Sequence, residues 1–213
     1  MAKARVYFTR EITPQAMDRL YDALGIRLSG KTAVKISTGE PGGHNFLQPA
    51  LIGPLTERLH GTIVECNTAY EGRRNTTQEH WKAIQEHGFL DIAPCDIMDE
   101  TGELALPVTN GMHLQENFVG AHLRNYDSML VLSHFKGHMM GGFGGALKNY
   151  FHRHRLCSRQ STYSRCGCSR GAMDGRSQLF SGVHGRRGQI RCRISGAAEH
   201  GFYQCCQPPF RGL

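Results

Sequence analysis

Ser128-Met-Leu-Val-Leu-Ser133 is the most apolar short run of the 213-residue chain, and it indicates the fold class. Consecutive apolar residues bounded by serines are typical of a strand that is buried on both faces, as in the middle of a parallel sheet. We therefore expect this strand at the centre of the sheet. A loop rich in histidine and glycine follows it, His134-Phe-Lys-Gly-His-Met-Met-Gly-Gly-Phe-Gly-Gly145.

Strand and helix signals alternate in the residues before this run. Runs rich in β-formers occupy residues 5–9, 32–36, 61–66 and 92–97. Helical spacing of apolar residues appears at Met17, Leu20, Tyr21 and Leu24, then at Leu51, Ile52, Leu55 and Leu59, and finally at Trp81 and Ile84. The alternation predicts an α/β fold: a mostly parallel sheet with helices on both faces, in Rossmann-like layers, and incomplete at its C-terminus.

Helix boundaries in this region carry recognisable end signals. Thr13 is suited to be an N-cap, with Pro14 at the first helical position and Gly25 as the stop. Thr76 and Glu79 have the spacing of a capping box. His80 and His87 are expected on the exposed face of the helix that follows.

The last part of the chain differs in composition. Residues 150–213 contain 11 Arg, no Lys and only two acidic residues, whereas residues 1–149 contain 14 Lys and Arg against 16 Asp and Glu. The formal charge of +7 therefore comes from the tail, and the main domain needs no anionic macromolecule as a partner. With few large aliphatic side chains, such a tail cannot offset its ordering entropy. We assign residues 1–149 to one truncated α/β domain and predict that residues 150–213 are disordered.

Three interpretations of this Arg/Gly/Cys-rich tail are open: a natural basic arm, a metal-binding Cys/His tail, and an out-of-frame coding sequence. Cys166-Gly-Cys168 and Cys205-Cys206 lack the C-x-x-C spacing typical of zinc and cluster sites. Codon degeneracy favours the third interpretation. Read one base later, the codons of residues 150–156 permit Ile-Ser-Ile-Gly-Ile-Ala-Ser, which resembles ordinary α/β sequence. A frameshift near Asn149 is the leading hypothesis.

Three unusual loops follow predicted strands, and in parallel sheets sites collect at the carboxyl ends of strands. Loop 37–45 contains Ser-Thr-Gly-Glu-Pro-Gly-Gly-His-Asn, which is either a plain turn or a glycine-lined anion site. Loop 67–75 contains two adjacent arginines suited to a carboxylate or phosphate, or else it is a solvated turn. Loop 134–145 is too rich in glycine for a helix and indicates backbone wrapped closely around a ligand.

The candidate site residues come from these loops and the strands before them. The candidates for proton transfer are His44, His134 and His138. The candidates for metal binding are Cys66, His134 and His138; the two histidines would share one face if the segment were helical, although no acidic partner of an H-E-x-x-H motif lies between them. The candidates for binding a substrate anion are Lys35, Glu40, Gly42, Gly43, Arg73, Arg74, Lys136, Gly141 and Gly142.

The loops resemble those of domain-of-unknown-function family 362. The resemblance is carried by Val34-Lys-Ile-Ser-Thr-Gly-Glu-Pro-Gly-Gly-His-Asn-Phe46, Glu65-Cys-Asn-Thr-Ala-Tyr70, Arg73-Arg-Asn-Thr-Thr77 and Ser133-His-Phe-Lys-Gly-His-Met-Met-Gly-Gly-Phe-Gly-Gly-Ala-Leu-Lys-Asn149, and covers residues 4–149. It implies an association with ferredoxin-like four-iron clusters and a label of iron–sulfur protein, but no particular reaction. Family members continue after Asn149 with residues that the shifted frame permits, and later reach a Cys-Asp-Cys element. The written frame lacks this element, so we expect no cluster to be bound by this chain.

Two functions follow from these residues and from the resemblance. The first is a redox-associated or metal-dependent enzyme, or an enzyme acting on a small anionic molecule. The second is a non-catalytic module that hands a ligand or electrons to a ferredoxin-like partner. Nucleic-acid binding would rest on the tail arginines alone, and we expect none. No apolar run has the length of a signal peptide or membrane span, so we expect a cytoplasmic protein with reduced thiols and no membrane partner.

Overall fold

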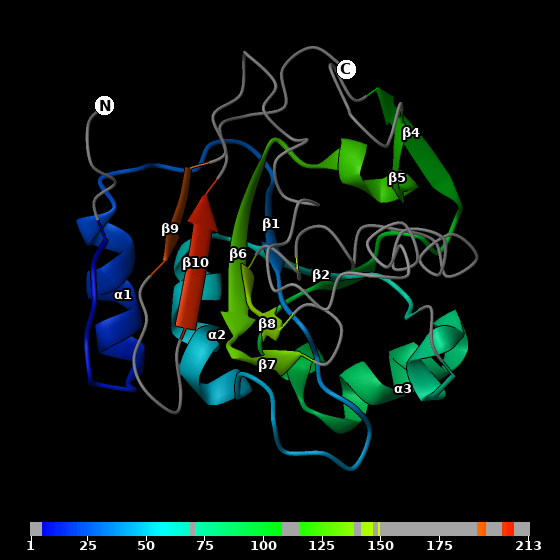
Figure 1. Ribbon diagram of the computed structural model, residues 1–213, viewed down its shortest axis with the longest axis horizontal. Helices are drawn as coiled ribbons and strands as arrows, with labels where there is room; N and C mark the ends of the chain where they lie inside the picture. Colours follow the sequence, from blue (N-terminus) through cyan, green and yellow to red (C-terminus); the bar gives the residue numbers. More distant parts are fainter. Residues whose placement is uncertain are drawn as a thin grey trace.

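The computed structural model describes residues 6–68, 71–107, 116–138, 142–146, 149, 191–194 and 202–206. Its main element is a six-stranded sheet in the order β3-β2-β1-β6-β10-β9 (Figure 1). The strands are β1 (Thr32–Lys35), β2 (Thr62–Glu65), β3 (Cys95–Ile97), β6 (Ser128–His134), β9 (Arg191–Ile194) and β10 (Phe202–Cys206).

Four of these strands are parallel. β1 pairs with β2 and with β6, and β2 pairs with β3, all in the same direction. The fold is therefore α/β, and β6 lies in the interior of the sheet with its first six residues buried, as its apolar run predicts. The chain moves outward from β1 to β2 to β3 and then returns to the other side of β1, so the strand order reverses between β1 and β6.

Three α-helices of ten residues each precede or connect the parallel strands: α1 (Pro14–Ala23), α2 (Pro49–Arg58) and α3 (Thr77–Glu86). Thr13 caps α1 as predicted, because its side chain accepts from the backbone N–H of Ala16 at 3.2 Å. The predicted capping box of α3 is wrong. Thr76 makes no side-chain cap, and Glu79 instead accepts hydrogen bonds from basic side chains on the surface.

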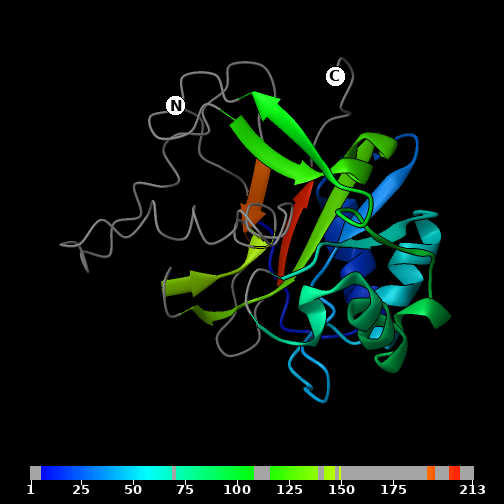
Figure 2. The same ribbon diagram turned by 90° about the vertical axis from the view of Figure 1, so that its right-hand side faces the viewer.

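The two faces of the sheet are covered differently (Figure 2). All three α-helices pack on one face, in a core with Val34, Ile63 and Leu130. The opposite face, with Val64 and Met129, packs on a hairpin of β4 (Glu103–Pro107) and β5 (Glu116–Gly120), on the 3₁₀ helix η3 (Ala121–Asn125) and on Ala146. In the described residues the expected arrangement of helices on both faces is thus corrected to α-helices on one face. In the described residues, the connection from β3 to β6 forms a hairpin and a 3₁₀ helix on this face instead of an α-helix.

The remaining elements are short. The hairpin consists of β4 (Glu103–Pro107) and β5 (Glu116–Gly120), and a second hairpin consists of β7 (Lys136–His138) and β8 (Gly142–Gly144). The 3₁₀ helices are η1 (Arg73–Asn75), η2 (Phe89–Asp91) and η3 (Ala121–Asn125). Among the described residues, none of the helices combines the length and hydropathy needed to cross a bilayer.

Gly120, the last residue of β5, allows the closest backbone approach in this layer. A Cβ atom built on it would lie 2.5 Å from the carbonyl carbon of Met98. Only glycine permits this contact, because real Cβ atoms do not approach a backbone so closely. The turn after β3 is thereby held against the start of η3.

Two segments differ from the sequence-based expectation. The run at residues 5–9 predicts a strand, but residues 6–9 form none, and Val6 and Phe8 are about half exposed. After residue 149 the sequence pattern predicts no strand, yet β10 pairs antiparallel with β6, and β9 pairs with β10. Pairing at a sheet edge needs backbone hydrogen bonds and some β-prone residues, which Phe202-Tyr-Gln-Cys-Cys206 supplies. The domain boundary at residue 149 stays a prediction.

Candidate functional site

The carboxyl ends of β1 and β2 carry a buried ion pair. Lys35 and Glu65 are the last residues of these strands, and both side chains are fully buried. Lys35 Nζ donates to Glu65 Oε2 at 2.7 Å and to the carbonyl oxygen of Ile36, also at 2.7 Å. A buried lysine and a buried carboxylate are tolerated because each supplies the other's counter-charge.

Asn149 joins this pair to the end of β6. Its Oδ1 accepts from Lys35 Nζ at 3.1 Å, and its Nδ2 donates to Ser133 Oγ at 2.8 Å and to the carbonyl oxygen of Leu132 at 3.3 Å. Asn149 therefore bridges the carboxyl ends of β1 and β6. This is the point at which the strand order reverses, where open α/β sheets bind their ligands.

His80 of α3 lies inside the same network. Its Nδ1 is 3.2 Å from Asn67 Oδ1, and its Nε2 is 3.4 Å from Thr38 Oγ1 and 4.0 Å from Glu65 Oε1. Asn67 Nδ2 donates to Thr77 Oγ1 at 2.9 Å, which orients the amide so that its oxygen faces His80. Nδ1 therefore donates to Asn67 Oδ1, and Nε2 faces the Thr38 hydroxyl, whose own proton is donated to Glu65 Oε1 at 3.3 Å.

The expectation that His80 and His87 are surface residues is therefore wrong. His80 is completely buried, and His87 is partly buried, with its ring stacked on Phe46 at 4.3 Å between centroids. His87 Nδ1 donates to the carbonyl oxygen of Thr38 at 2.6 Å. Both histidines face loop 37–45, His80 from within α3 and His87 from the residue that directly follows this helix.

Arg74 extends the network toward loop 37–45. Its side chain is 1% exposed, and its guanidinium forms a two-point ion pair with Glu40, in which Nε donates to Oε2 at 3.3 Å and Nη2 donates to Oε1. Nη1 donates to Glu65 Oε1 at 3.4 Å. Glu40 itself is about half exposed. Loops 37–45 and 67–75 thus meet above β1 and β2, as the sequence pattern predicts.

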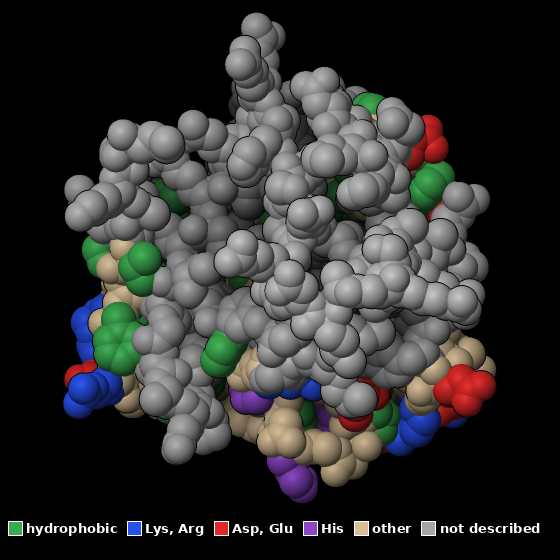
Figure 3. All heavy atoms as spheres, viewed as in Figure 1, with side chains coloured by type: hydrophobic (Ala, Val, Ile, Leu, Met, Phe, Trp, Pro, Cys, Tyr) green, Lys and Arg blue, Asp and Glu red, His purple; other side chains and the backbone are tan. Residues whose placement is uncertain are grey.

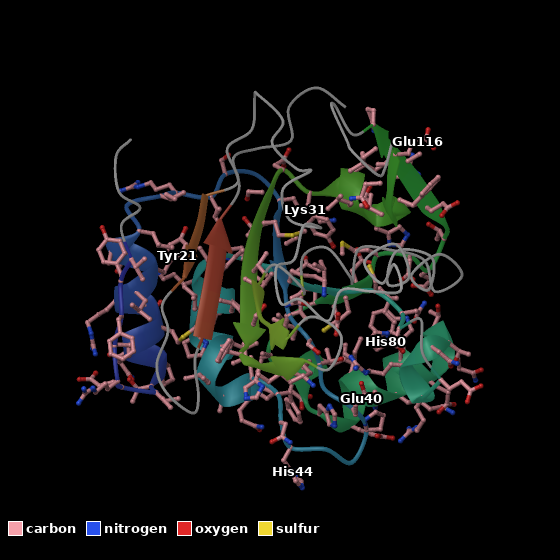
Figure 4. All side chains as sticks on the ribbon, in the orientation of Figure 1. Tyr21, Lys31, Glu40, His44, His80 and Glu116 are labelled. Carbon is pink, nitrogen blue, oxygen red and sulfur yellow. The ribbon has the colours of Figure 1, made fainter. Side chains whose placement is uncertain are left out.

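Arg73 and His44 point elsewhere. Arg73 donates to Glu86 at 2.7 Å and to Glu79 at 3.3 Å on the outer surface of α3. Opposite charges gather in this way at the lower corners of the space-filling view (Figure 3). His44 is exposed at the far end of its loop and points away from Glu40 and His80 (Figure 4). Among the predicted residues of loops 37–45 and 67–75, Glu40 and Arg74 contact each other, whereas His44 and Arg73 lie away from that pair.

Other predicted residues lie along the loop after β6. His134 is the last residue of β6 and is partly buried, and Lys136 begins β7 and is exposed. The backbone of His138 pairs with Gly142 in the β7–β8 hairpin, so the segment is a hairpin and not a helix. The side chain of His138 and all of Gly141 lie outside the described residues. In loop 37–45, Gly42 has a left-handed φ of 74°, and the N–H of Gly43 donates to Glu40 O at 2.9 Å.

Cys66 and Asp99 lie just beyond the end of β2. Cys66 is fully buried, and burial together with the nearby Asp99 carboxylate raises the pKa of its thiol. The protonated thiol is favoured, which is the opposite of what a metal-binding thiolate requires. Burial also raises the pKa of Asp99 to about 6, against two contacts from the backbone N–H of Asn67 at 3.0 and 3.2 Å.

The implied iron–sulfur cluster has no ligand set in the described part of the chain. Cys66 and Cys95 are its only cysteines with described side chains, and burial raises the pKa of the Cys95 thiol to about 12. These ranges contain no group of three His, Cys, Asp or Glu side chains placed to hold a metal ion. The residues present here do not fit a four-cysteine cluster, and we derive no chemistry through one.

Sequence reasoning missed six members of the network: Thr38, Glu65, Asn67, His80, Asp99 and Asn149. Only Glu65 had a clear signal, because it is a charged residue inside an apolar strand and such residues are rarely buried unless paired. His80 was hidden because a histidine on an amphipathic helix is equally compatible with either face.

The fold and this site define a class: a parallel α/β domain with a buried, charged network at the point of strand-order reversal. Comparison with protein families identifies the family within this class. The profile described as "Domain of unknown function (DUF362)" matches residues 32–165, which is more than half of the chain, and the protein belongs to this family. The match runs beyond Asn149. Comparison with curated proteins and with solved structures gives no match.

Proposed function

We propose that this DUF362 protein binds a small organic anion at the carboxyl edge of its parallel strands, with Arg74 as the anchor. The observation that carries the proposal is the charge of the network. Two cations, Lys35 and Arg74, are buried there, and of the two carboxylates that contact them in the described part of the chain, Glu65 is fully buried. The second carboxylate, Glu40, is half in solvent on a glycine-containing loop.

Glu40 occupies the place that a ligand carboxylate would take. It contacts Arg74 through both oxygens, which is the geometry in which a guanidinium binds carboxylates and phosphates. Gly39 and Gly42 flank it with left-handed φ values of 84° and 74°. Such residues let the loop change direction with little strain, so a ligand could displace Glu40 while Arg74 stays buried.

Lys35 has a positioning role in this proposal. Its three N–H donors point at Glu65, Ile36 and Asn149, so it holds the ends of β1, β2 and β6 in register. It raises the positive potential near Arg74 without contacting the ligand. This changes its role from the direct anion contact expected from the sequence.

Thermal-shift measurements on the full chain with malonate, citrate, inorganic phosphate and sulfate test the proposal. We expect at least one of these anions to raise the melting temperature of the wild type, and the same anion to shift Glu40→Gln more. Arg74→Lys should lose most of the shift, because lysine cannot form the two-point contact. Arg73→Lys is the matched control and should keep it.

The shift is compared within each variant with and without the anion, since each substitution also changes the basal stability. An equal shift in the wild type and Arg74→Lys would contradict the proposal. The concentrations at which inorganic phosphate and malonate raise the melting temperature are then compared. The anion that acts at the lower concentration indicates whether the site prefers phosphates or carboxylates.

A more specific proposal is a redox or metal-associated role, in which His134 and His138 would bind a metal ion. The family resemblance supports it, and metal analysis of an in-frame relative tests it, with His134→Ala and His138→Ala as the variants. The alternative is a non-catalytic module that serves a ferredoxin-like partner. The absence of turnover in a protein that still binds the anion would favour that alternative. We also propose that the protein is located in the cytoplasm.

A further inference from the structure

A second cluster of polar side chains lies at the outer edge of the sheet, on β3 and the segments that follow it. His122 of η3 stands between two oxygen atoms. Its Nδ1 is 2.7 Å from Asp96 Oδ1, and its Nε2 is 2.7 Å from Thr101 Oγ1. None of these residues belongs to the network around Lys35.

The protonation of this cluster follows from its contacts. A carboxylate only accepts, so Nδ1 of a neutral His122 carries the proton and donates it to Asp96. Nε2 is then an acceptor, and the Thr101 hydroxyl donates to it. This is the order of hydroxyl, imidazole and carboxylate in which a histidine removes the proton of a nucleophile.

The carboxylate and the imidazole are held in place by further groups. Tyr126 donates its phenol O–H to Asp96 Oδ2 at 2.7 Å, so both carboxylate oxygens are fixed. The backbone N–H of His122 donates to the carbonyl oxygen of Met98 at 3.0 Å. The side chains of Asp96 and His122 are only 18% and 21% exposed, whereas Thr101 is exposed. The base is therefore sheltered and the hydroxyl faces solvent.

We propose that Thr101, His122 and Asp96 form a nucleophilic site that accepts small acyl groups from carboxylic esters. Thr101 Oγ adds to the ester carbonyl carbon while its proton passes to His122 Nε2. The tetrahedral adduct expels the alcohol oxygen, which takes that proton, and the acyl group remains on Thr101. Water then repeats the sequence with the same base, releases the carboxylic acid and restores the hydroxyl.

In the described part of the chain, the backbone N–H of Thr101 has no protein acceptor, whereas the neighbouring N–H groups of Glu100 and Gly102 donate to Ile97 and Asp99. The N–H of a nucleophilic residue is a common donor to the oxygen of the tetrahedral adduct. Thr101 is an exposed residue and bears both this N–H and the hydroxyl, which is consistent with that use.

Incubation of the full chain with p-nitrophenyl acetate, followed by peptide-level mass spectrometry, tests this site. We expect release of p-nitrophenolate, an acetyl adduct on the peptide that contains Thr101, and loss of that adduct in Thr101→Val. Removal of the base in His122→Gln should slow acylation by about 10²-fold. Thr101→Ser keeps the hydroxyl and should be acylated at least as fast.

His60→Gln, at an exposed histidine of another loop, is the control and should leave the rate unchanged. Acetylation of Thr101→Val at the wild-type rate, or adducts confined to lysines and cysteines, would overturn the proposal. If Thr101→Val does not fold, adduct mapping on the wild type and on Thr101→Ser still decides the matter. A failure here leaves the anion site at Arg74 untouched, because the two sites share no residue.

Discussion

Lys35 and Asn149 are 114 positions apart in the sequence, and Lys35 Nζ donates to Asn149 Oδ1 over 3.1 Å at the carboxyl edge of the sheet. The same asparagine donates to Ser133 and Leu132. One amide thus fixes the relative positions of the two central strands, β1 and β6, at the place where the strand order reverses.

Lys35→Met tests the energetic role of this contact. The substitution leaves Glu65 buried without its closest cation, and breaking one partner of a buried pair costs about 3–5 kcal/mol. Urea unfolding should give a free energy of unfolding that is lower than that of the wild type by this amount. The exposed Lys82→Met should change stability by less than about 0.5 kcal/mol. In the double variant Lys35→Met with Glu65→Leu, part of the loss should be recovered, and additive losses would argue against a coupled pair.

Asp99 makes stability depend on pH in a defined direction. Its pKa is about 6 in the folded state against an ordinary 3.8, so the folded state holds a proton more tightly than the unfolded state. This contribution is complete below about pH 4 and is lost as the pH rises through about 6, amounting to at most about 3 kcal/mol. Asp99→Asn should lack it.

Unfolding free energies of the wild type and Asp99→Asn, measured across this pH range, check the prediction. The difference between them should move in favour of the asparagine variant as the pH rises and then level off above pH 6. Glu100→Gln, at an exposed neighbouring carboxylate, serves as the control. A difference that is constant with pH would show that Asp99 titrates normally.

Cys66 should resist alkylation in the folded protein. Burial excludes the reagent and raises the pKa of the thiol, and both effects suppress the reactive thiolate. Iodoacetamide labelling followed by peptide mass spectrometry should leave the Cys66 peptide unmodified until the chain is denatured. Rapid labelling without denaturant would instead favour Cys66 as the thiolate ligand that its place at the end of a strand suggests.

Gly120→Ala should be strongly destabilising for a steric reason. The new Cβ would meet the backbone of Met98 at 2.5 Å, and the backbone cannot move without shifting the turn after β3. Gly25→Ala is the matched comparison, because Gly25 has a φ of 62° but open space around its Cα. That change should cost about 1 kcal/mol from conformational strain alone. Equal thermal destabilisation of the two variants would refute the steric account.

The origin of residues 150–213 is decided by the gene. Codon degeneracy predicts an extra base near the Asn149 codon, after which the in-frame product would continue in ordinary α/β sequence. Nucleotide sequencing across this codon in independent isolates tests the hypothesis. An uninterrupted reading frame with the same codons in every isolate would establish the tail as the natural sequence.

Much of the fold follows from local patterns in the sequence. The apolar run of β6, the N-cap Thr13 and the stop at Gly25 each depend on a few neighbouring residues, and the structure confirms all three. The run at residues 5–9 has the same local pattern but no strand partner for residues 6–9. A strand exists only when another backbone pairs with it, and a pattern within one segment does not contain that information.

The candidate site was predictable only in outline. Three loops were expected to meet at one edge, and two of them do meet there, because Glu40 of loop 37–45 pairs with Arg74 of loop 67–75. Which member of each loop turns inward was not predictable. Arg73 and Arg74 are adjacent and chemically identical, yet one lies on the surface of α3 and the other is buried, because backbone direction in η1 decides between them.

β6 is also the strand at which the sheet changes polarity. It runs with β1 but against β10, so Phe202, the first residue of β10, pairs with His134 at the rim where the parallel strands finish. A slip of one position in this pairing would turn every side chain of β10 to the opposite face. Which residue of β10 lies beside His134 therefore depends on the register of the β6–β10 pairing.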